Sequence, residues 1–210
     1  MPDVTVIAVD GPAAAGKGTL ARRLADHLGL RYLDSGRLYR AVAAKLLRGG
    51  NDPNDAARAV AAARSLTPED LEASGLRHET VGRAASVLAP QAEVRAALLG
   101  YQRDFAQGPP GAVIDGRDIG TVVFPDATHK LFVTASLEVR VGRRCRELAE
   151  RGEAADRAAV RGEMAARDAR DQGRDVAPLV AAADAHVLDT SQLDAEAAFS
   201  AALALIHTGQ

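Results

Sequence analysis

The sequence predicts an α/β protein with a doubly wound, five-stranded parallel sheet, to which a helical insert and a helical lid are added. Short apolar segments recur along the chain, long helical patterns separate them, and polar residues follow most of them. Apolar runs without polar alternation are typical of strands that are buried on both faces of a parallel sheet. In such sheets, ligands bind beyond the carboxyl ends of the strands.

The first predicted strand runs from Val4 to Val9 and ends at Asp10-Gly11. The other four are the apolar segments at residues 32–33, 112–114, 130–133 and 186–188. Polar residues that could bind a ligand follow these strands at residues 34–36 and 115–118. Those at 134–136 and 189–191 have an alternative interpretation as helix caps.

The first helix is predicted from Lys17 to Leu28, because its apolar residues recur at helical spacing, and Gly29 is expected to end it. A length of 210 residues suits one domain, residues 1–210. We expect an acceptor-side insert at about residues 49–90, whose Thr67-Pro68 is a typical helix start. The arginine-rich, helical stretch at about residues 140–175 is predicted to be a lid.

Composition excludes several classes of protein. A formal net charge of −2 gives no global field for binding a nucleic acid. The apolar stretch from Ala195 to Ile206 is shorter than the ~20 residues of a membrane-spanning helix, so no membrane association is expected. Residues 1–10 lack a secretion-signal pattern.

Cysteine and histidine usage also limits the possibilities. Cys145 is the single cysteine, so no intramolecular disulfide can form, which fits the cytoplasm. The five histidines are scattered and show no ligand spacing. We therefore expect no metal site made by protein side chains alone.

A phosphate-binding loop follows the first strand. Its residues are Gly11, Pro12, Ala13, Ala14, Ala15, Gly16, Lys17, Gly18 and Thr19. Backbone N–H groups in such a loop surround the β-phosphate of a nucleotide, and the lysine spans the β- and γ-phosphates. A glycine-rich turn without a ligand is the alternative, but the two glycines, the lysine and the strand-to-helix context favour a nucleotide. The motif predicts binding and leaves the chemistry open.

Arginines in later motifs indicate phosphoryl transfer. Guanidinium groups bind phosphate oxygens bidentately and stabilise the charge on a transferring phosphoryl group, acting together with Mg²⁺. The candidates for these roles are Arg40, Arg117, Arg167, Arg170 and Arg174. With Lys17, the last four form the predicted catalytic set.

Several segments carry a resemblance to one family. The loop's Gly-Lys-Gly-Thr resembles that of adenylate and cytidylate kinases and not that of GTPases. Three further segments, residues 33–40, 114–127 and 167–174, resemble successive signatures of bacterial cytidylate kinases, and so do Ala85-Ser86 and Val94-Arg95 in spacing. This P-loop family transfers the γ-phosphoryl group of ATP to CMP or dCMP, in pyrimidine nucleotide metabolism. The resemblance implies that activity here.

The resemblance also implies roles for single residues. Ser35, Arg40 and Arg117 are expected to bind the acceptor phosphate. Ser86, Arg95 and Asp118 are expected to face the cytosine. Arg167 and Asp171 are the expected ribose contacts, and Arg174 a further phosphate contact. ATP is the expected donor, with Mg²⁺ held mainly by the phosphates, and a monomer is expected.

Two alternatives to this function stay open. One is a related kinase that accepts UMP or AMP. The other is a nucleotide-binding switch, although the chain lacks the Asn-Lys-x-Asp segment by which GTPases read the base, and a protein that binds one nucleotide has no use for the late arginines.

The sequence departs from the family in two places. The alternating strands expected before Ser86 are missing, so a helical insert is predicted there. Ala14 stands where relatives often have glycine. A third point is open: Arg140, Arg143 and Arg144 either approach the donor or lie on a solvated helix face, so they are left out of the predicted site.

Overall fold

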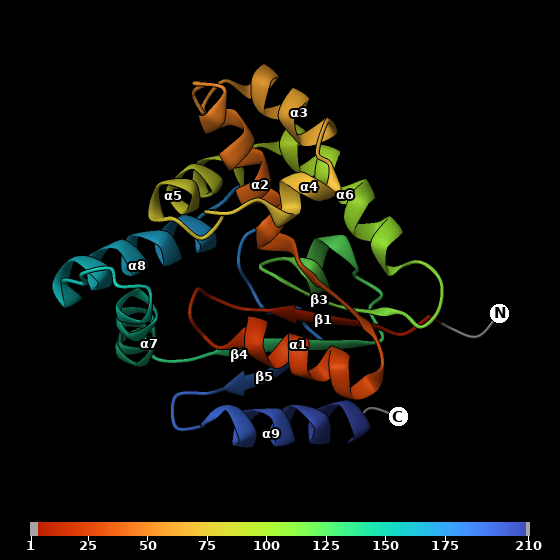
Figure 1. Cartoon of the computed structure of the whole chain (residues 1–210). Helices are drawn as coiled ribbons and strands as arrows, with labels where there is room; N and C mark the ends of the chain where they lie inside the picture. Colours follow the sequence, from red (N-terminus) through yellow and green to blue (C-terminus); the bar gives the residue numbers. More distant parts are fainter. Residues whose placement is uncertain (1–3, 209–210) are drawn as a thin grey trace. The chain divides into compact units, whose positions relative to one another are not determined.

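The computed structural model describes residues 4–208 and confirms the predicted α/β fold (Figure 1). The five strands are β1 (Val6–Asp10), β2 (Arg31–Asp34), β3 (Ala112–Gly116), β4 (His129–Thr134) and β5 (His186–Asp189). They form one sheet in the order β2-β3-β1-β4-β5. The central strand β1 pairs in parallel with β3 and β4, and β4 pairs in parallel with β5. This order puts β1 and β3, whose ends carry Asp10 and Asp115, next to each other.

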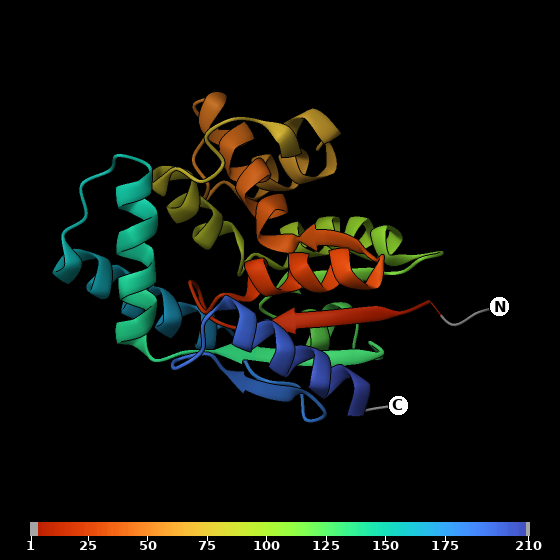
Figure 2. The ribbon, with the colours of Figure 1, turned by 60° about the horizontal axis from the view of Figure 1, so that its bottom comes forward.

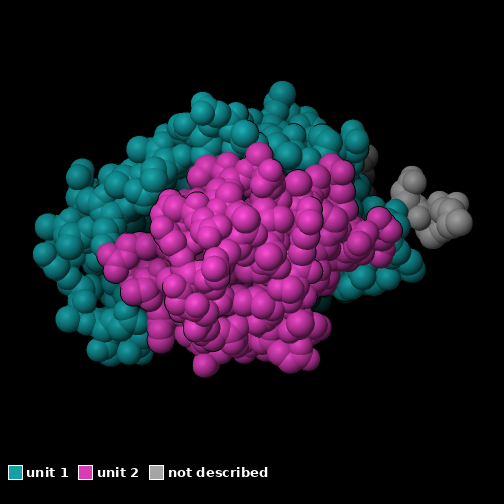
Figure 3. Space-filling model, turned by 90° about the horizontal axis from the view of Figure 1, so that it is seen from above, with its two compact units in different colours: residues 1–32, 108–210 teal, residues 33–107 magenta. Residues whose placement is uncertain are grey.

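The chain forms two compact units, which Figure 3 colours separately. Unit 1 contains the described residues up to Tyr32 and from Gly108 onward, and unit 2 contains Leu33 to Gln107. The division into one domain with an insert at about 49–90 and a lid at about 140–175 stays a prediction.

The core of unit 1 lies between the sheet and two helices. Helices α1 (Lys17–Leu28) and α9 (Ala195–Thr208) lie side by side on one face of the sheet (Figure 2). Ile7 and Val9 of β1 and Leu24 of α1 are fully buried in this core. Full burial of consecutive β1 residues explains why the strand shows no polar alternation. Gly29 ends α1 in the left-handed conformation, as predicted.

Helices α7 (Leu137–Glu150) and α8 (Arg157–Gln172) occupy the predicted lid segment and pack on each other. Val141, Leu148, Val160 and Met164 form their small apolar cluster. Ser136 caps α7 by accepting a hydrogen bond from Val139 N, which confirms the interpretation as a cap. The same interpretation of residues 189–191 is wrong, because Asp194 accepts from the first N–H groups of α9.

Unit 2 is helical apart from the end of β2, as predicted for the insert. Its helices are α2 (Ser35–Arg48), α3 (Ala56–Arg64), α4 (Pro68–Glu72), α5 (Glu79–Leu88) and α6 (Ala92–Ala106). Thr67 and Asp70 form a capping box at the start of α4, with Pro68 in its first turn. The alanines Ala59, Ala62 and Ala63 are buried on α3. Small apolar residues thus build a core in a segment whose sequence shows no strong core pattern.

None of the helices in the described part of the chain is long and apolar enough to span a bilayer.

Candidate functional site

The phosphate loop has the backbone shape that its glycines predict. Gly11 has a φ of +148°, and a Cβ atom there would lie 1.9 Å from Val133 O, so only glycine fits. Gly16 precedes α1 with a φ of 91°, and no side chain caps the first N–H groups of this helix. These groups and the positive end of the helix dipole are suited to bind an anion.

Arginines of α7 contact the loop from the side of its carbonyl groups. Arg140 Nη1 donates a hydrogen bond to Ala13 O at 3.3 Å, and Arg143 Nη1 donates to Ala15 O at 3.2 Å. Thr190 Oγ1 also donates to Ala15 O, at 2.9 Å. Arg140 and Arg143, which the predicted site left out, therefore contact the phosphate loop, and their approach to the donor itself stays a prediction.

The third arginine of that group behaves differently. Arg144 pairs with Glu147 of its own helix, with 2.9 Å between Nη1 and Oε2. Such an i,i+3 pair stabilises a helix surface by only a few tenths of a kcal/mol, about 0.2–0.5.

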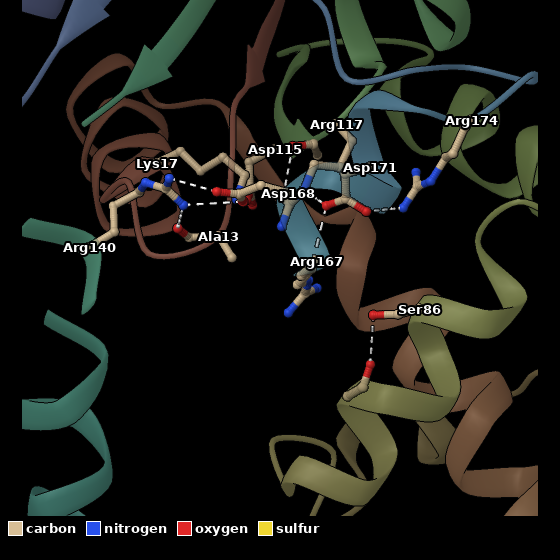
Figure 4. Close-up of polar contacts among 12 residues, drawn as sticks. Ala13, Lys17, Ser86, Asp115, Arg117, Arg140, Arg167, Asp168, Asp171 and Arg174 are labelled. Atoms are coloured by element: carbon tan, nitrogen blue, oxygen red, sulfur yellow. Dashed lines mark hydrogen bonds and ion pairs between the residues drawn. The ribbon is translucent and has the colours of Figure 1, made fainter. Parts of the chain in front are cut away.

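Lys17 and Asp115 lie beside each other at the carboxyl ends of the central strands (Figure 4). Lys17 Nζ is 4.0 Å from Asp115 Oδ2, and both side chains are buried. Tyr32 donates its hydroxyl hydrogen to Asp115 Oδ1 at 2.7 Å. The carboxylate is thus held in one orientation next to the lysine that the loop motif assigns to the phosphates. The sequence analysis placed Asp115 in a motif without giving it a role.

The carboxylate beside Lys17 is suited to bind a Mg²⁺ ion that is also held by substrate phosphates and water. Mg²⁺ keeps several waters and is bound by one or two carboxylates together with substrate phosphates. Asp115 is a buried carboxylate in that position, next to the loop. Among residues 4–208 no group of three or more acidic, histidine or cysteine side chains is arranged to hold a metal ion.

Asp171 gathers three arginines in unit 1 (Figure 4). Its side chain is nearly fully buried on α8, and Oδ2 accepts a hydrogen bond from Arg117 Nε at 2.9 Å. Arg174 pairs with its other oxygen, and Arg167 Nε lies 4.0 Å away. Burial alone would raise the pKa of Asp171, but the guanidinium groups of Arg117, Arg174 and Arg167 outweigh it and hold the pKa below its usual value. Three cations and one anion leave this cluster with two positive charges, which favours a phosphate.

Arg170 does not join this cluster. It lies exposed in the last turn of α8, and it takes part in none of the ion pairs found in residues 4–208.

Ser35 and Arg40 lie at the N-terminal end of α2 in unit 2. Ser35 is the buried first residue of the helix. The side chain of Asp34 caps the helix by accepting a hydrogen bond from Arg37 N at 3.0 Å. Arg40 Nη2 donates to Asp34 Oδ2 at 2.5 Å. Asp34 therefore orients the guanidinium group of Arg40 from the same side as the helix start.

The residues predicted to read the base come from three separate elements. Ser86 of α5 donates to Gly82 O of its own helix at 3.0 Å (Figure 4). Arg95 of α6 donates to Ala89 O at 3.2 Å. Asp118 is buried in unit 1 and precedes η1 (Ile119–Val123), a single π-helical turn.

Asp10 was not among the predicted site residues. It ends β1 directly before the loop, and its carboxylate accepts hydrogen bonds from Ile119 N at 2.8 Å and Gly120 N at 2.7 Å. Burial is the main reason that its pKa is raised to about 6. In the sequence, Asp10 could have been recognised as a polar residue at the carboxyl end of the central strand, where ligands of such sheets bind.

The family follows from comparison with known proteins. A family model described as cytidylate kinase matches residues 7–208. The chain belongs to the cytidylate kinase family. It is similar to a cytidylate kinase of Paramagnetospirillum magneticum, with 60% identity over 96% of this chain and 97% of the relative. It is also similar to one of Rhodospirillum rubrum, with 58% identity over 98% of this chain and 99% of the relative.

Solved structures agree with the fold of a cytidylate kinase family member. An uncharacterized protein from Eubacterium ventriosum has a TM-score of 0.60 at 14% identity, and the alignment covers 98% of this chain and 99% of that one. A sugar kinase from Janibacter sp. has a TM-score of 0.52 at 16% identity, covering 98% and 95%. At these identities the likeness shows the fold alone.

For this family member, the structure brings part of the predicted site together. Lys17 stands in the loop, and Arg117, Arg167 and Arg174 converge on Asp171. Arg170 stays outside this cluster. The sequence analysis did not select Asp10, Asp115, Arg140 and Arg143, because their partners are distant along the chain.

Proposed function

We propose that this protein transfers the γ-phosphoryl group of ATP to CMP or dCMP, giving ADP and CDP or dCDP in pyrimidine nucleotide metabolism. The observation that carries this proposal is the pairing, within unit 1 of a cytidylate kinase family member, of a phosphate loop with a positively charged cluster around Asp171. The loop suits a donor phosphate, and the cluster suits further phosphate charge.

On the donor side, the loop residues Gly11 to Thr19 bind the phosphates of ATP through backbone N–H groups at the start of α1. Lys17 contacts the β- and γ-phosphates and stabilises the charge that develops on the γ-phosphoryl group during transfer. Its place in a buried position beside Asp115 supports this role. A low local dielectric strengthens such an interaction.

On the acceptor side, Ser35, Arg40 and Arg117 bind the phosphate of CMP, and Arg174 adds a further contact. Arg117, Arg167 and Arg174 stabilise the transferring group, since their net charge exceeds what Asp171 neutralises. Arg170 is part of the proposed catalytic set, and its exposed position leaves its guanidinium group accessible to solvent and substrate.

Asp115 is the residue that would hold Mg²⁺, together with the phosphates and water. When bound, the ion neutralises charge on the β- and γ-phosphates. The hydrogen bond from Tyr32 keeps the carboxylate of Asp115 oriented for this task.

Base and ribose recognition is proposed for a second set of residues. Ser86, Arg95 and Asp118 would read the cytosine, which offers a 4-amino donor and an unprotonated N3 acceptor. Arg167 and Asp171 would contact the ribose. We also propose a monomer in the cytoplasm.

A coupled assay of ADP release tests the proposal. With ATP and Mg²⁺ present, we expect ADP formation that depends on CMP or dCMP, and weaker activity with UMP, AMP and GMP. A preference for UMP or AMP would assign the chain to another acceptor. Slow ADP formation that is independent of any nucleoside monophosphate would instead indicate a nucleotide-binding switch.

A further inference from the structure

Asp10 connects two parts of the chain that the proposed mechanism uses separately. It is the residue before Gly11, where the phosphate loop begins. Its two carboxylate oxygens accept hydrogen bonds from the N–H groups of Ile119 and Gly120, which are 109 and 110 residues away along the chain. These groups directly follow Arg117 and Asp118. One buried carboxylate therefore links the donor loop to the turn that carries two proposed acceptor contacts.

The turn after Asp118 has no side-chain cap from its own N-terminal residue. The π-helical turn η1 starts at Ile119, and the side chain of Asp118 makes no capping hydrogen bond to it. Asp10 supplies that cap from another strand. The packing around the contact is tight, because a Cβ atom on Gly120 would lie 3.4 Å from Asp10 Oδ2 and 3.2 Å from Lys130 Cδ. The position of the turn is thus determined by Asp10 and its neighbours.

The ionised form of the Asp10 carboxylate is costly in the folded protein. Burial raises its pKa to about 6 despite the two backbone hydrogen bonds, so its ionised form is disfavoured in the folded protein. Asp118 adds to the rise, and Lys17 opposes it. The charge of Lys130, the other cation near the turn, is held by Asp184, with Nζ and Oδ2 2.7 Å apart. Groups kept in an unfavourable ionisation state are concentrated at functional sites.

We propose that Asp10 is a positioning residue for acceptor recognition, which holds the Arg117-Asp118 turn in register with the phosphate loop. The inference rests on the proposed function, and it adds a residue that does not itself touch the nucleotide. Asp118 can select cytosine only if its carboxylate is held within a few tenths of an ångström, about 0.5 Å, of its productive place. Loss of the contact from Asp10 should therefore impair base choice more than ATP binding.

Asp10→Asn tests the inference. The amide keeps the size of the side chain but offers one acceptor oxygen, so its NH₂ group faces one of the two backbone N–H groups. The unsatisfied N–H group lets the turn shift, and a shift of contacts made in the transition state lowers kcat/KM by roughly tenfold to a hundredfold. We expect kcat/KM for CMP to fall by about that factor and the CMP-to-UMP ratio of kcat/KM to fall at least threefold. The KM for ATP should change by less than about twofold.

Asp70→Asn is the matched control. Asp70 is also a buried aspartate that accepts a backbone N–H, from Thr67 at 3.2 Å, but it lies in the cap of α4. Its loss should lower the unfolding temperature and leave the CMP-to-UMP ratio unchanged. Both variants are assayed well below their unfolding temperatures, so that a loss of folded protein does not imitate a loss of selectivity.

A second variant approaches the same contact from the other partner. Gly120→Ala places a methyl group against Asp10 Oδ2 and the Lys130 side chain, and we expect it to lower the ratio as well. It takes over the test if Asp10→Asn does not fold. An unchanged CMP-to-UMP ratio in the folded variant would overturn the inference while wild-type CMP kinase activity stands. If the wild type shows no CMP-dependent ADP formation, the proposed function and this inference fail together.

Discussion

Arg140 of α7 and Asp168 of α8 form a bidentate ion pair, with Nη1 3.2 Å from Oδ1 and Nη2 2.6 Å from Oδ2. The same guanidinium group donates to Ala13 O in the phosphate loop at 3.3 Å and to Ala135 O at 2.9 Å. Arg140 therefore ties the loop to the helix that carries Arg167 and Asp171. Bidentate, charge-assisted pairs of this kind are stronger and more specific in geometry than single neutral hydrogen bonds.

Arg140→Lys should weaken ATP binding. Lysine keeps the charge but cannot form the planar, bidentate contacts that arginine makes. The lost contacts correspond to about 1–3 kcal/mol, so we expect the KM for ATP to rise at least fivefold. Asp168→Asn should have a similar effect, and in the double variant the two losses should not add, because the residues are in contact.

Arg157→Lys is the control for that experiment. Arg157 pairs with Glu138 at 3.3 Å on the surface, where both side chains are exposed. Exposed pairs contribute little because water and salt screen them, so the KM for ATP should stay within twofold. If the losses add in the Arg140 and Asp168 double variant, the two residues do not act together on the phosphate loop.

Lys17→Met should abolish phosphoryl transfer and leave the fold intact. Methionine retains the apolar stem but removes the charge that would meet the β- and γ-phosphates. We expect kcat to fall by at least a hundredfold, on the scale of losing one stabilising contact to the transition state. Coupled assays of ADP release measure the loss of kcat, and thermal unfolding shows whether the variant is folded. Near-normal turnover would show that the loop does not bind the reacting phosphates as proposed.

Ala14→Gly should stabilise the protein. Ala14 has a φ of 59°, in the left-handed region that non-glycine residues avoid. That conformation costs alanine roughly 1–2 kcal/mol, more than the entropy that glycine loses on folding, about 0.5–1 kcal/mol. We expect a gain of roughly 0.5–1 kcal/mol in the free energy of unfolding, measured by urea titration. Ala13→Gly, in the same loop but without a positive φ, should give no gain, and equal effects would contradict this explanation.

Base choice should depend on Asp118 and Ser86. Cytosine can pair a carboxylate and a hydroxyl that uracil leaves unsatisfied, and each unpaired buried group costs about 1–3 kcal/mol. Asp118→Asn or Ser86→Ala should therefore lower kcat/KM for CMP more than for UMP. Ser86 donates to Gly82 O, which leaves its hydroxyl oxygen able to accept a hydrogen bond from the 4-amino group of cytosine. An unchanged CMP-to-UMP ratio in both variants would remove these residues from base recognition.

Asp10 should make the protein less stable as the pH rises. Its folded pKa of about 6 lies above its ordinary 3.8, so the native state binds the proton more tightly than the unfolded state between these values. Stability from this group is present below pH 4 and is lost as the pH rises through 6, by up to about 3 kcal/mol. Asp10→Asn lacks this loss. Its free energy of unfolding, relative to wild type, should increase between pH 4.5 and pH 7.5 in urea titrations, and a flat difference would contradict the raised pKa.

The sequence by itself determined the elements that depend on local patterns. Strand β1, helix α1 and the loop between them follow from neighbouring residues, namely the apolar run from Val6, the helical spacing after Lys17, and Gly11 and Gly16. The helical insert was also predictable, because Thr67 and Pro68 mark a helix start and alternation is absent. Family signatures named the arginines around Asp171.

Only the tertiary structure decided which charged groups meet. Arg140 lies 127 residues from Ala13, and Asp10 lies 110 residues from Gly120, so no spacing in the sequence relates them. An arginine on a polar helix is equally compatible with a solvated face until the neighbouring segment is known. In the folded chain, Arg140 is buried against loop carbonyl groups that need hydrogen-bond donors. The carboxylate of Asp10 is also buried, which disfavours its charged form, and two distant N–H groups only partly offset that cost.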